Sequence, residues 1–372
     1  MTQPPSYRHP HRHEISQADQ SESKATSLKS DQSITDMNTS GIPMSPVLPS
    51  KISASKPLTL GSLRIVPLTS NRKSRKKPVV KMGVRELDKA TVELREVDAG
   101  GQVPVLYAEN RTKHYVLFIE GDQLIGAKQN RICNSTVLLR PKSQIQIPVS
   151  CVEEGRWTHI SRNFSSSKFH ASPKLRRQIA KTKETTRQHT DGRQAHSASQ
   201  SQVWQHIIGF ASQAGVNSQT MAMEDVYQAR DQQFHEQLRN EHTVELGSTI
   251  IRDLSFACPK GSNGWILESP DGDISIDIFG TPKLCRWAWE RIIRSAAIEA
   301  TVYKKRVPAK SKPKFSLNNP KSIKKLLTSI QKSPLEKVIP VAAGVEQRFL
   351  NPNINGAYLT LDNRLVHLGL TV

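Results

Sequence analysis

The feature that most constrains this fold is a series of short, β-branched runs between residues 91 and 154, separated by Gly, Pro or Asn at short intervals. The runs are TVELREV, VPVLYAEN, HYVLFIEGDQLIGA, STVLLRP and SQIQIPVSCVEE. This spacing is typical of antiparallel strands, because parallel strands need a long and usually helical crossover between them. The Gly100-Gly101 pair predicts a hairpin turn between the first two runs.

Further hairpins and helices are predicted after this region. GWILESPDGDISIDIF should turn at Asp271-Gly272, and AYLTLDNRLVHLGLTV at Asp362-Asn363. Apolar spacing predicts helices in QSQVWQHIIGFAS, SQTMAMEDVYQARDQQFHEQLRNE and TPKLCRWAWERIIRSAAIEATVYKK. We therefore expect an α+β fold, an antiparallel β sandwich or barrel-like sheet with helices packed on one side. The sheet comes from residues 60–160, its final strands from 262–279 and 355–371, and the helices from 200–243 and 281–303.

Composition divides the chain into a tail and one domain. Residues 1–57 hold a single aromatic residue, Tyr7, among many Ser, Pro, Gln and His. Such a segment cannot bury enough apolar surface to offset the entropy of ordering. We expect a disordered tail at 1–57 and a single domain at 58–372.

The basic charge is concentrated in three segments that we expect to connect folded elements. The formal net charge is +20, and residues 71–81, 156–193 and 304–337 carry +6, +8 and +10. We expect solvated, flexible inserts near 165–195 and 304–337. Nucleic-acid binding through them is disfavoured, because stacking aromatic side chains do not interleave with the basic residues.

GDQLIGAKQNR, at residues 121–131, approaches a phosphate-binding P-loop without completing it. Gly121 and Gly126 have the required spacing, but Ala127 displaces the lysine by one position, and Gln129 stands where a metal-binding hydroxyl is needed. The next segment, ICNSTVLL, is strand-like, so no helix N-terminus would face a phosphate. We therefore reject a P-loop nucleotide triphosphatase.

Two polar clusters interrupt the strand pattern and supply the ligand-binding candidates. One consists of Glu120, Lys128, Gln129, Asn130 and Arg131, and the other of Glu153, Arg156 and Trp157, which follow Cys151. Together these groups suit a nucleotide-like ligand, because guanidinium binds anions, amides read polar edges and indole stacks on a flat base. The alternative is an internal Glu–Arg ion pair with a core Trp, and residue types alone leave both readings open.

The catalytic candidates are weaker, and whether the chain is an enzyme stays open. Glu153 could act as a general base if apolar neighbours raise its pKa, whereas Cys151 has no adjacent His to activate its thiol. Asp277 and His367 could complete an acid–base set. The cysteines show no metal-ligand spacing, so we expect free thiols, no metal and a cytoplasmic location. The absence of a run of about 18 apolar residues argues against a membrane span.

The polar clusters resemble the signature of a known domain family. The most specific strings are FIEGDQLIGAKQNRICNSTVLL and IPVSCVEEGRW. QVWQHI, GWILESPDGDISIDIFGTPKL, RSAAIEA and LTLDNRLVHLGL extend the likeness over most of residues 60–372. The chain thus resembles the ARG and Rhodanese-Phosphatase-superfamily-associated protein domain family (ARPP, first type), where ARG stands for ADP-ribosylglycohydrolases.

The resemblance implies a link to ADP-ribose or NAD-derived nucleotide metabolism, with an ADP-ribose-like ligand, no bound cofactor and no defined reaction. The family-like positions are Glu120, Gly121, Gly126, Lys128, Gln129, Asn130, Arg131, Cys151, Glu153, Gly155, Arg156, Trp157, Asp277 and His367. Our first hypothesis is a ligand pocket near 120–131 and 151–157. The alternatives are a non-enzymatic interaction scaffold and, least favoured, a nucleic-acid-binding domain.

Overall fold

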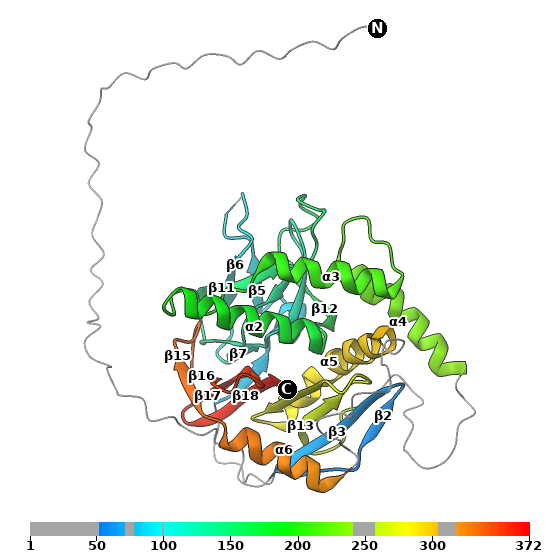
Figure 1. The fold of residues 1–372 in the computed structure, drawn as a ribbon. Helices are drawn as coiled ribbons and strands as arrows, with labels where there is room; N and C mark the ends of the chain where they lie inside the picture. The colour runs from blue at the N-terminus through cyan, green and yellow to red at the C-terminus, as the bar shows by residue number, and fades with distance from the viewer. Residues whose placement is uncertain (1–51, 71–77, 99, 241–256, 304–316, 318) are drawn as a thin grey trace, which may run out of the picture. The chain divides into compact units, whose positions relative to one another are not determined.

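The structure is a computed structural model that describes residues 52–70, 78–98, 100–240, 257–303, 317 and 319–372. Within these residues the elements form three β-sheets and six helices (Figure 1). Neighbouring strands pair antiparallel throughout, except for the parallel pair of β4 and β7. The expected α+β class with antiparallel sheets is therefore confirmed.

The largest sheet has nine strands, and we call it the main sheet. Its order is β1-β3-β13-β14-β18-β17-β16-β15, with β2 paired to β3 beside this path. The strands are β1 (Ile52–Ala54), β2 (Leu58–Leu60), β3 (Leu63–Ser70), β13 (Ser262–Glu268), β14 (Ile274–Phe279), β15 (Leu335–Val338), β16 (Val345–Phe349), β17 (Asn355–Leu361) and β18 (Arg364–Thr371). The predicted turn between β17 and β18 is confirmed, since Asp362 and Asn363 both have positive φ, of 49° and 56°.

The two smaller sheets share one core. Their orders are β10-β7-β4 and β12-β8-β9-β11-β6-β5. The strands are β4 (Val80–Met82), β5 (Val92–Arg95), β6 (Val105–Asn110), β7 (Tyr115–Phe118), β8 (Asp122–Gly126), β9 (Arg131–Cys133), β10 (Val137–Leu139), β11 (Ser143–Cys151) and β12 (Phe164–His170). Leu94, Phe118, Leu124, Leu139 and Val149, from both sheets, are buried in a single apolar cluster. This part of the chain is accordingly barrel-like.

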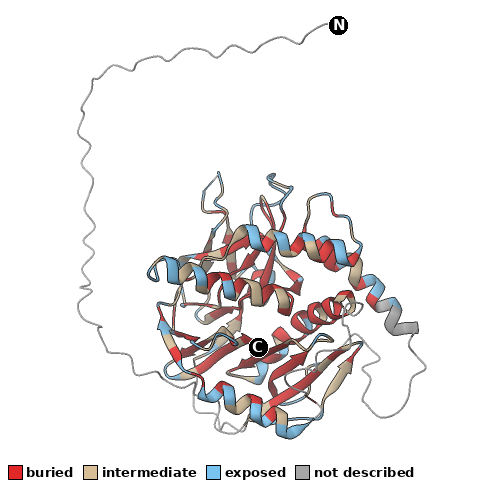
Figure 2. Ribbon diagram, in the orientation of Figure 1, coloured by how far each residue is buried: buried red, intermediate tan, exposed pale blue. Residues whose placement is uncertain are grey.

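Helices cover both faces of the main sheet. Neighbouring residues of β13 point to opposite faces, as the pleat requires: Trp265 packs with helix α5 (Pro282–Tyr303) and Ile266 packs with helix α6 (Pro320–Lys332). The buried strands of this sheet lie between the two helices (Figure 2). On the α5 side, Trp265 and Trp289 make an edge-on contact with ring centroids 5.3 Å apart. The helix α6 was not expected from the sequence.

Three of the remaining helices, α2 (Pro173–His189), α3 (Gln200–Ala214) and α4 (Met223–Asn240), form a third apolar cluster beside the smaller sheets. The short helix α1 (Gly83–Asp88) instead places Leu87 in the cluster of the smaller sheets. Ile179 of α2, Phe210 of α3 and Tyr227 of α4 are buried together in the third cluster. The predicted helices near 200–243 and 281–303 are therefore present as α3, α4 and α5.

The basic segment near 165–195 is folded, in contrast to the flexible insert expected there. It contains β12 and α2, and the Ser172 side chain caps α2 by accepting a hydrogen bond from the N–H of Leu175. The helix α2 was not predicted because two of its buried side chains, Arg176 and Lys183, are cations rather than apolar groups. A helix anchored by ion pairs has a weak apolar pattern.

Two other expected boundaries also differ from the structure. Residues 52–54, placed in the disordered tail, form strand β1 and pair with β3. Within the second expected insert, residues 320–332 form α6 and residues 335–338 form β15. The rest of the expected tail, 1–51, and residues 304–316 lie outside the described residues.

The fold predicts that two isoleucines, Ile293 and Ile339, contribute very differently to the free energy of unfolding. Ile293 of α5 is fully buried in the cluster against the main sheet, whereas Ile339 is 86% exposed. We expect Ile293→Ala to lower the free energy of unfolding by about 2–5 kcal/mol, because it removes buried apolar contacts and leaves a cavity. Ile339→Ala should change it by less than about 0.5 kcal/mol. Urea unfolding of both variants measures the difference, and equal effects would contradict this packing.

Candidate functional site

The two polar clusters expected from the sequence meet in space, with the exception of Glu120. Strand β9 pairs with β11 so that Arg131 lies opposite Cys151, which brings the β8–β9 turn beside the segment that follows β11. The turn is tight, with Gly126 and Ala127 both at positive φ, of 126° and 44°. A hairpin at this position also agrees with the rejection of a P-loop, which would need a helix here.

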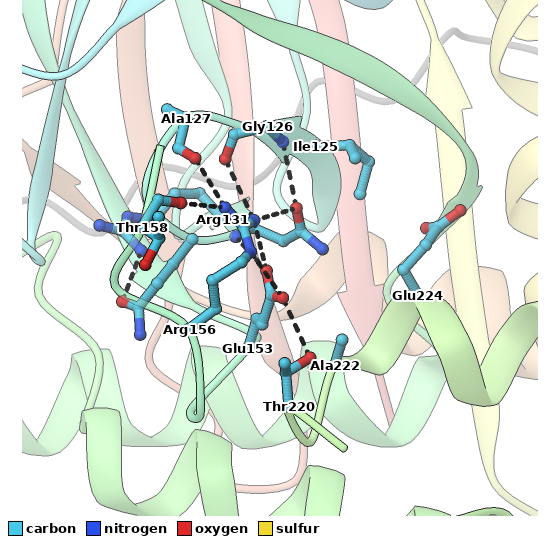
Figure 3. A network of polar contacts seen from close by, with 12 residues as sticks. Ile125, Gly126, Ala127, Arg131, Glu153, Arg156, Thr158, Thr220, Ala222 and Glu224 are labelled. Atoms are coloured by element: carbon cyan, nitrogen blue, oxygen red, sulfur yellow. Dashed lines mark hydrogen bonds and ion pairs between the residues drawn. The ribbon is translucent and has the colours of Figure 1, made fainter. Parts of the chain in front are cut away.

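Arg156 is fully engaged within the protein. Its Nε and Nη2 donate to the two carboxylate oxygens of Glu153 at 2.8 and 2.6 Å (Figure 3). Its Nη1 donates to the carbonyl oxygens of Ala127 and Thr158 at 2.6 and 2.9 Å. Its Nη2 also contacts Asn130 Oδ1 at 3.3 Å. We call this network, Glu153 and Arg156 with their partners, the Arg156 clamp.

The Glu153 carboxylate has no oxygen left for a ligand. Besides Arg156 it accepts hydrogen bonds from the Asn130 N–H and the Thr220 hydroxyl, each at 3.0 Å. Burial alone would raise the pKa of Glu153, but the hydrogen bonds from Arg156 and Asn130 hold it below its usual value. An ionised, saturated carboxylate suits a structural clamp rather than a general base. The geometry of these two residues therefore agrees with the internal ion-pair alternative.

Arg131 and Trp157 form a neighbouring arrangement. Arg131 is completely buried; its Nη1 donates to Gln129 at 3.0 Å, and its Nη2 lies 3.6 Å from a Glu96 carboxylate oxygen. Trp157 is 46% exposed and covers this cation, with its ring centroid 5.8 Å from Arg131 Cζ and 5.2 Å from Lys128 Nζ. Trp157 is thus a surface cation–π partner and not a core residue.

Cys151 has the environment of an inert thiol. Its Sγ lies 3.1 Å from Gln129 Oε1 and 3.0 Å from the Glu153 carbonyl oxygen, both hydrogen-bond acceptors. Burial raises the pKa of the Cys151 thiol. Because the thiolate is the reactive form, a buried thiol that donates hydrogen bonds is a poor nucleophile.

Glu120 lies elsewhere, at a cavity of about 390 Å³ between α2 and the residues that connect β16 to β17. The Lys183 ammonium of α2 forms an ion pair with Glu120 and donates to the Ser135 hydroxyl at 3.2 Å. Burial lowers the pKa of Lys183, although Glu120 favours its charged form. The wall residues on α2 are Ala180, Lys181, Lys183, Glu184, Thr185, Arg187 and Gln188.

Arg348 of β16 supplies a second buried cation to the cavity. It is 7% exposed, and its Nε and Nη2 contact the Glu346 carboxylate, each at 3.0 Å. The Nη2 atom also lies 3.2 Å from His196 Nδ1. The Nη1 atom is buried without a hydrogen-bond partner. Arg348 therefore keeps one buried donor without a hydrogen-bond partner, in a residue that lines the cavity.

Asp277 and His367, the acid–base candidates, lie in direct contact with each other on β14 and β18, and β18 pairs with β17, which lines the cavity. His367 Nε2 is 3.0 Å from Asp277 Oδ1, and His367 Nδ1 is 3.3 Å from Thr136 Oγ1. Arg176 of α2 binds both Asp277 oxygens, each at 2.8 Å. The Glu120 N–H donates to Thr136 Oγ1 at 3.2 Å. We call Thr136, His367, Asp277 and Arg176 the His367 chain.

Small residues in the main sheet make room for these groups. Cross-strand pairing places Arg348, Ala357, Gly369 and Asp277 in one row across four adjacent strands. A side chain at Gly369 would displace the Arg176 guanidinium, since its Cβ would lie 2.7 Å from Arg176 Nη2. Ala357 lines the cavity floor. The sequence analysis did not identify Thr136, Arg176, Lys183 or Arg348 as site residues. The small residues Ala357 and Gly369 were the available sequence signal, because they leave room for polar side chains over the sheet.

Within the described residues, no group of three or more His, Cys, Asp or Glu side chains is placed to hold a metal ion. In the same part of the chain, no helix combines the length and apolar character needed to cross a membrane.

The comparison with known proteins gives one match. The family model described as ARG and Rhodanese-Phosphatase-superfamily-associated Protein domain matches residues 51–371. No curated protein and no solved structure matches the chain.

The Arg156 clamp generates a stability prediction. Arg156→Ala should lower the free energy of unfolding by about 3–5 kcal/mol, because it leaves the Glu153 carboxylate buried without its counterion. The matched control is Arg111→Ala, which breaks an exposed pair with Glu93 and Glu109 and should cost under about 1 kcal/mol. Urea unfolding compares the two variants. If Arg156→Ala lowered the free energy of unfolding no more than Arg111→Ala, the structural role would be contradicted and Arg156 would again be a candidate for ligand binding.

The lowered pKa of Glu153 also predicts a pH dependence. Since its folded pKa lies below the unfolded value of about 4.3, the ionised carboxylate contributes stability above that pH. This contribution is lost as the pH falls through the folded pKa. The stability gap between the wild type and Glu153→Gln should therefore be widest near neutral pH and narrow in acid. Denaturation at several pH values tests this, and a gap that widens in acid would have the wrong sign.

Proposed function

The chain belongs to the family of ARG and Rhodanese-Phosphatase-superfamily-associated protein domains, and we propose that its cavity beside α2 binds a phosphorylated, ribose-containing metabolite of the ADP-ribose class. The ARG of the family description, read as ADP-ribosylglycohydrolase, supports this choice of ligand. The proposal moves the expected pocket from the Arg156 clamp to the cavity that Glu120 lines.

The observation that carries the proposal is the basic lining of the cavity, to which Lys181, Lys183, Arg187 and Arg348 contribute. Arg348 Nη1 is buried without a partner in a residue that lines the cavity. Lys181 and Lys183 of α2 line the same space, and Lys181 is exposed. A phosphate accepts hydrogen bonds from guanidinium and ammonium groups, so these side chains suit a phosphorylated ligand.

The size and the remaining lining suit the rest of such a ligand. Small-molecule sites measure roughly 300–1,000 Å³ and combine apolar walls with a few placed polar groups. The volume here is about 390 Å³, and the lining includes Phe349, Ile354, Gln188, Asn351 and Asn355. Amide groups and the Glu120 carboxylate supply partners for ribose hydroxyls. The cytoplasmic location expected above remains part of the proposal, and the cysteines at 133, 151, 258 and 285 are free thiols.

A scaffold without a ligand is the second candidate function. The saturated Arg156 clamp favours it, because the most specific polar string of the sequence then serves the fold. The nucleic-acid hypothesis loses support, since cations of the 156–193 segment such as Arg176 and Lys183 pair with internal carboxylates. Ligand binding separates the first two candidates directly.

Isothermal titration with ADP-ribose tests the proposal on the wild type and two cavity variants. Lys181→Glu reverses one exposed lining charge, and Ala180→Phe fills space on the α2 wall. Each should weaken binding at least tenfold, a loss of about 1.4 kcal/mol. The matched control Lys325→Glu reverses an exposed lysine on α6, on the other face of the main sheet, and should leave the affinity unchanged.

Two outcomes would reject the ligand proposal. One is the absence of ADP-ribose binding to the folded wild type, which would favour the scaffold. The other is equal weakening by Lys181→Glu and Lys325→Glu, which would indicate a general charge effect instead of a site at the cavity.

A further inference from the structure

The His367 chain has the connectivity of an activated hydroxyl. Arg176 and the hydrogen bond from His367 hold the pKa of Asp277 below its usual range, although burial alone would raise it. An ionised Asp277 can only accept hydrogen bonds, so His367 Nε2, 3.0 Å away, must carry a proton. In the neutral imidazole, Nδ1 is then an acceptor. The Thr136 hydroxyl, at 3.3 Å, is the donor that faces it.

The second partner of Thr136 agrees with this assignment. The Glu120 N–H donates to Thr136 Oγ1 at 3.2 Å, so the hydroxyl accepts one hydrogen bond and is free to donate the other to His367. Arg176 and His367 fix both oxygens of Asp277, so the carboxylate and the imidazole are held in place. This is the order of a hydroxyl nucleophile, an imidazole base and an orienting carboxylate.

Thr136 is next to a residue of the cavity lining, because its hydroxyl accepts a hydrogen bond from the Glu120 N–H. Thr136 is partly exposed, whereas His367 and Asp277 behind it are buried. Its backbone partner Glu120 lines the cavity, and so does Ala357, from the strand next to His367. We therefore expect a reacting group at the Glu120 end of the cavity to approach Thr136, with the Lys183 ammonium paired to the Glu120 carboxylate at the same end.

Ser135 provides an internal comparison. Its hydroxyl lies 2.9 Å from His196 Nδ1, but His196 Nε2 contacts the Ile339 carbonyl oxygen rather than a carboxylate. Ser135 is also fully buried and accepts a hydrogen bond from Lys183. The hydroxyls of Ser135 and Thr136 thus each contact a histidine. Of these two residues, only Thr136 is partly exposed, and only its histidine contacts a carboxylate through the other ring nitrogen.

We propose that Thr136 is a nucleophile activated by His367 and Asp277, and that it accepts a phosphoryl group from a phosphate monoester bound in the cavity. The Thr136 O–P bond forms as the ester P–O bond breaks, and the Thr136 proton passes to His367 Nδ1 and on to the leaving alkoxide. Water then attacks phosphorus, gives a proton to His367, and breaks the Thr136 O–P bond, after which His367 returns the proton to Thr136. The balance is ester plus water to alcohol plus phosphate. The choice of substrate rests on the proposed function, but the reactivity of Thr136 does not.

The first experiment tests Thr136 with an ethyl fluorophosphonate probe on the full chain. Attack by the hydroxyl forms a P–O bond and expels fluoride, and intact-mass and peptide analysis locate the adduct. We expect one adduct at Thr136 in the wild type, its retention in Thr136→Ser, and its loss in the isosteric Thr136→Val. His367→Gln should slow labelling at least a hundredfold, within the range of general-base catalysis. Thr328→Ala, at a partly exposed threonine on α6, is the matched control and should label normally.

The second experiment measures phosphate release from p-nitrophenyl phosphate. The wild type should release it, and Thr136→Val should lose at least a hundredfold of the rate while retaining its ADP-ribose affinity. Labelling without turnover would overturn the phosphate-ester substrate class. The absence of an adduct at Thr136, an adduct at Ser135 instead, or labelling unaffected in a folded His367→Gln would overturn the nucleophile. A labelled Thr136 in a chain that fails to bind ADP-ribose would reject the proposed ligand and leave the nucleophile standing.

Discussion

The structure around the cavity depends on ion pairs between one basic helix and carboxylates of the sheets. Arg176 and Lys183 of α2 are buried, and they pair with Asp277 of the main sheet and with Glu120 after β7. A buried charge without a partner is far more costly than a buried pair, so each cation fixes where α2 can lie. The same two pairs bring one wall of the cavity and the His367 chain together.

The Arg156 clamp, which comes from the most distinctive strings of the sequence, and the cavity beside α2 are built from different residues. The Arg156 clamp uses every donor of Arg156 and both oxygens of Glu153 to hold the β8–β9 turn against the segment after β11. Arg348, by contrast, keeps a buried nitrogen without a partner at the cavity. A specific polar string can thus meet the demands of a tight turn instead of those of a ligand.

Much of the fold could be predicted from local sequence signals. Features that depend on contacts between residues far apart in the sequence could not. The hairpin at Asp362-Asn363 and the helix α5 follow from turn chemistry and apolar spacing, which neighbouring residues determine. The helix α2 was read as a flexible insert, because the partner of Arg176 lies 101 residues away along the chain. Asp277 and His367 were recognised as candidates, but Thr136 lies 231 residues from His367, and sequence spacing cannot show such a contact.

The most direct test of this account is amide hydrogen exchange across residues 173–189. A helix fixed by buried ion pairs should exchange slowly, with protection comparable to that of α5 in the same molecule, because opening it would expose Arg176 and Lys183 together with their carboxylates. Exchange of α2 at the rate of an unstructured peptide, while α5 stays protected, would contradict the account. In that case the basic segment would be the flexible insert that its composition first indicated.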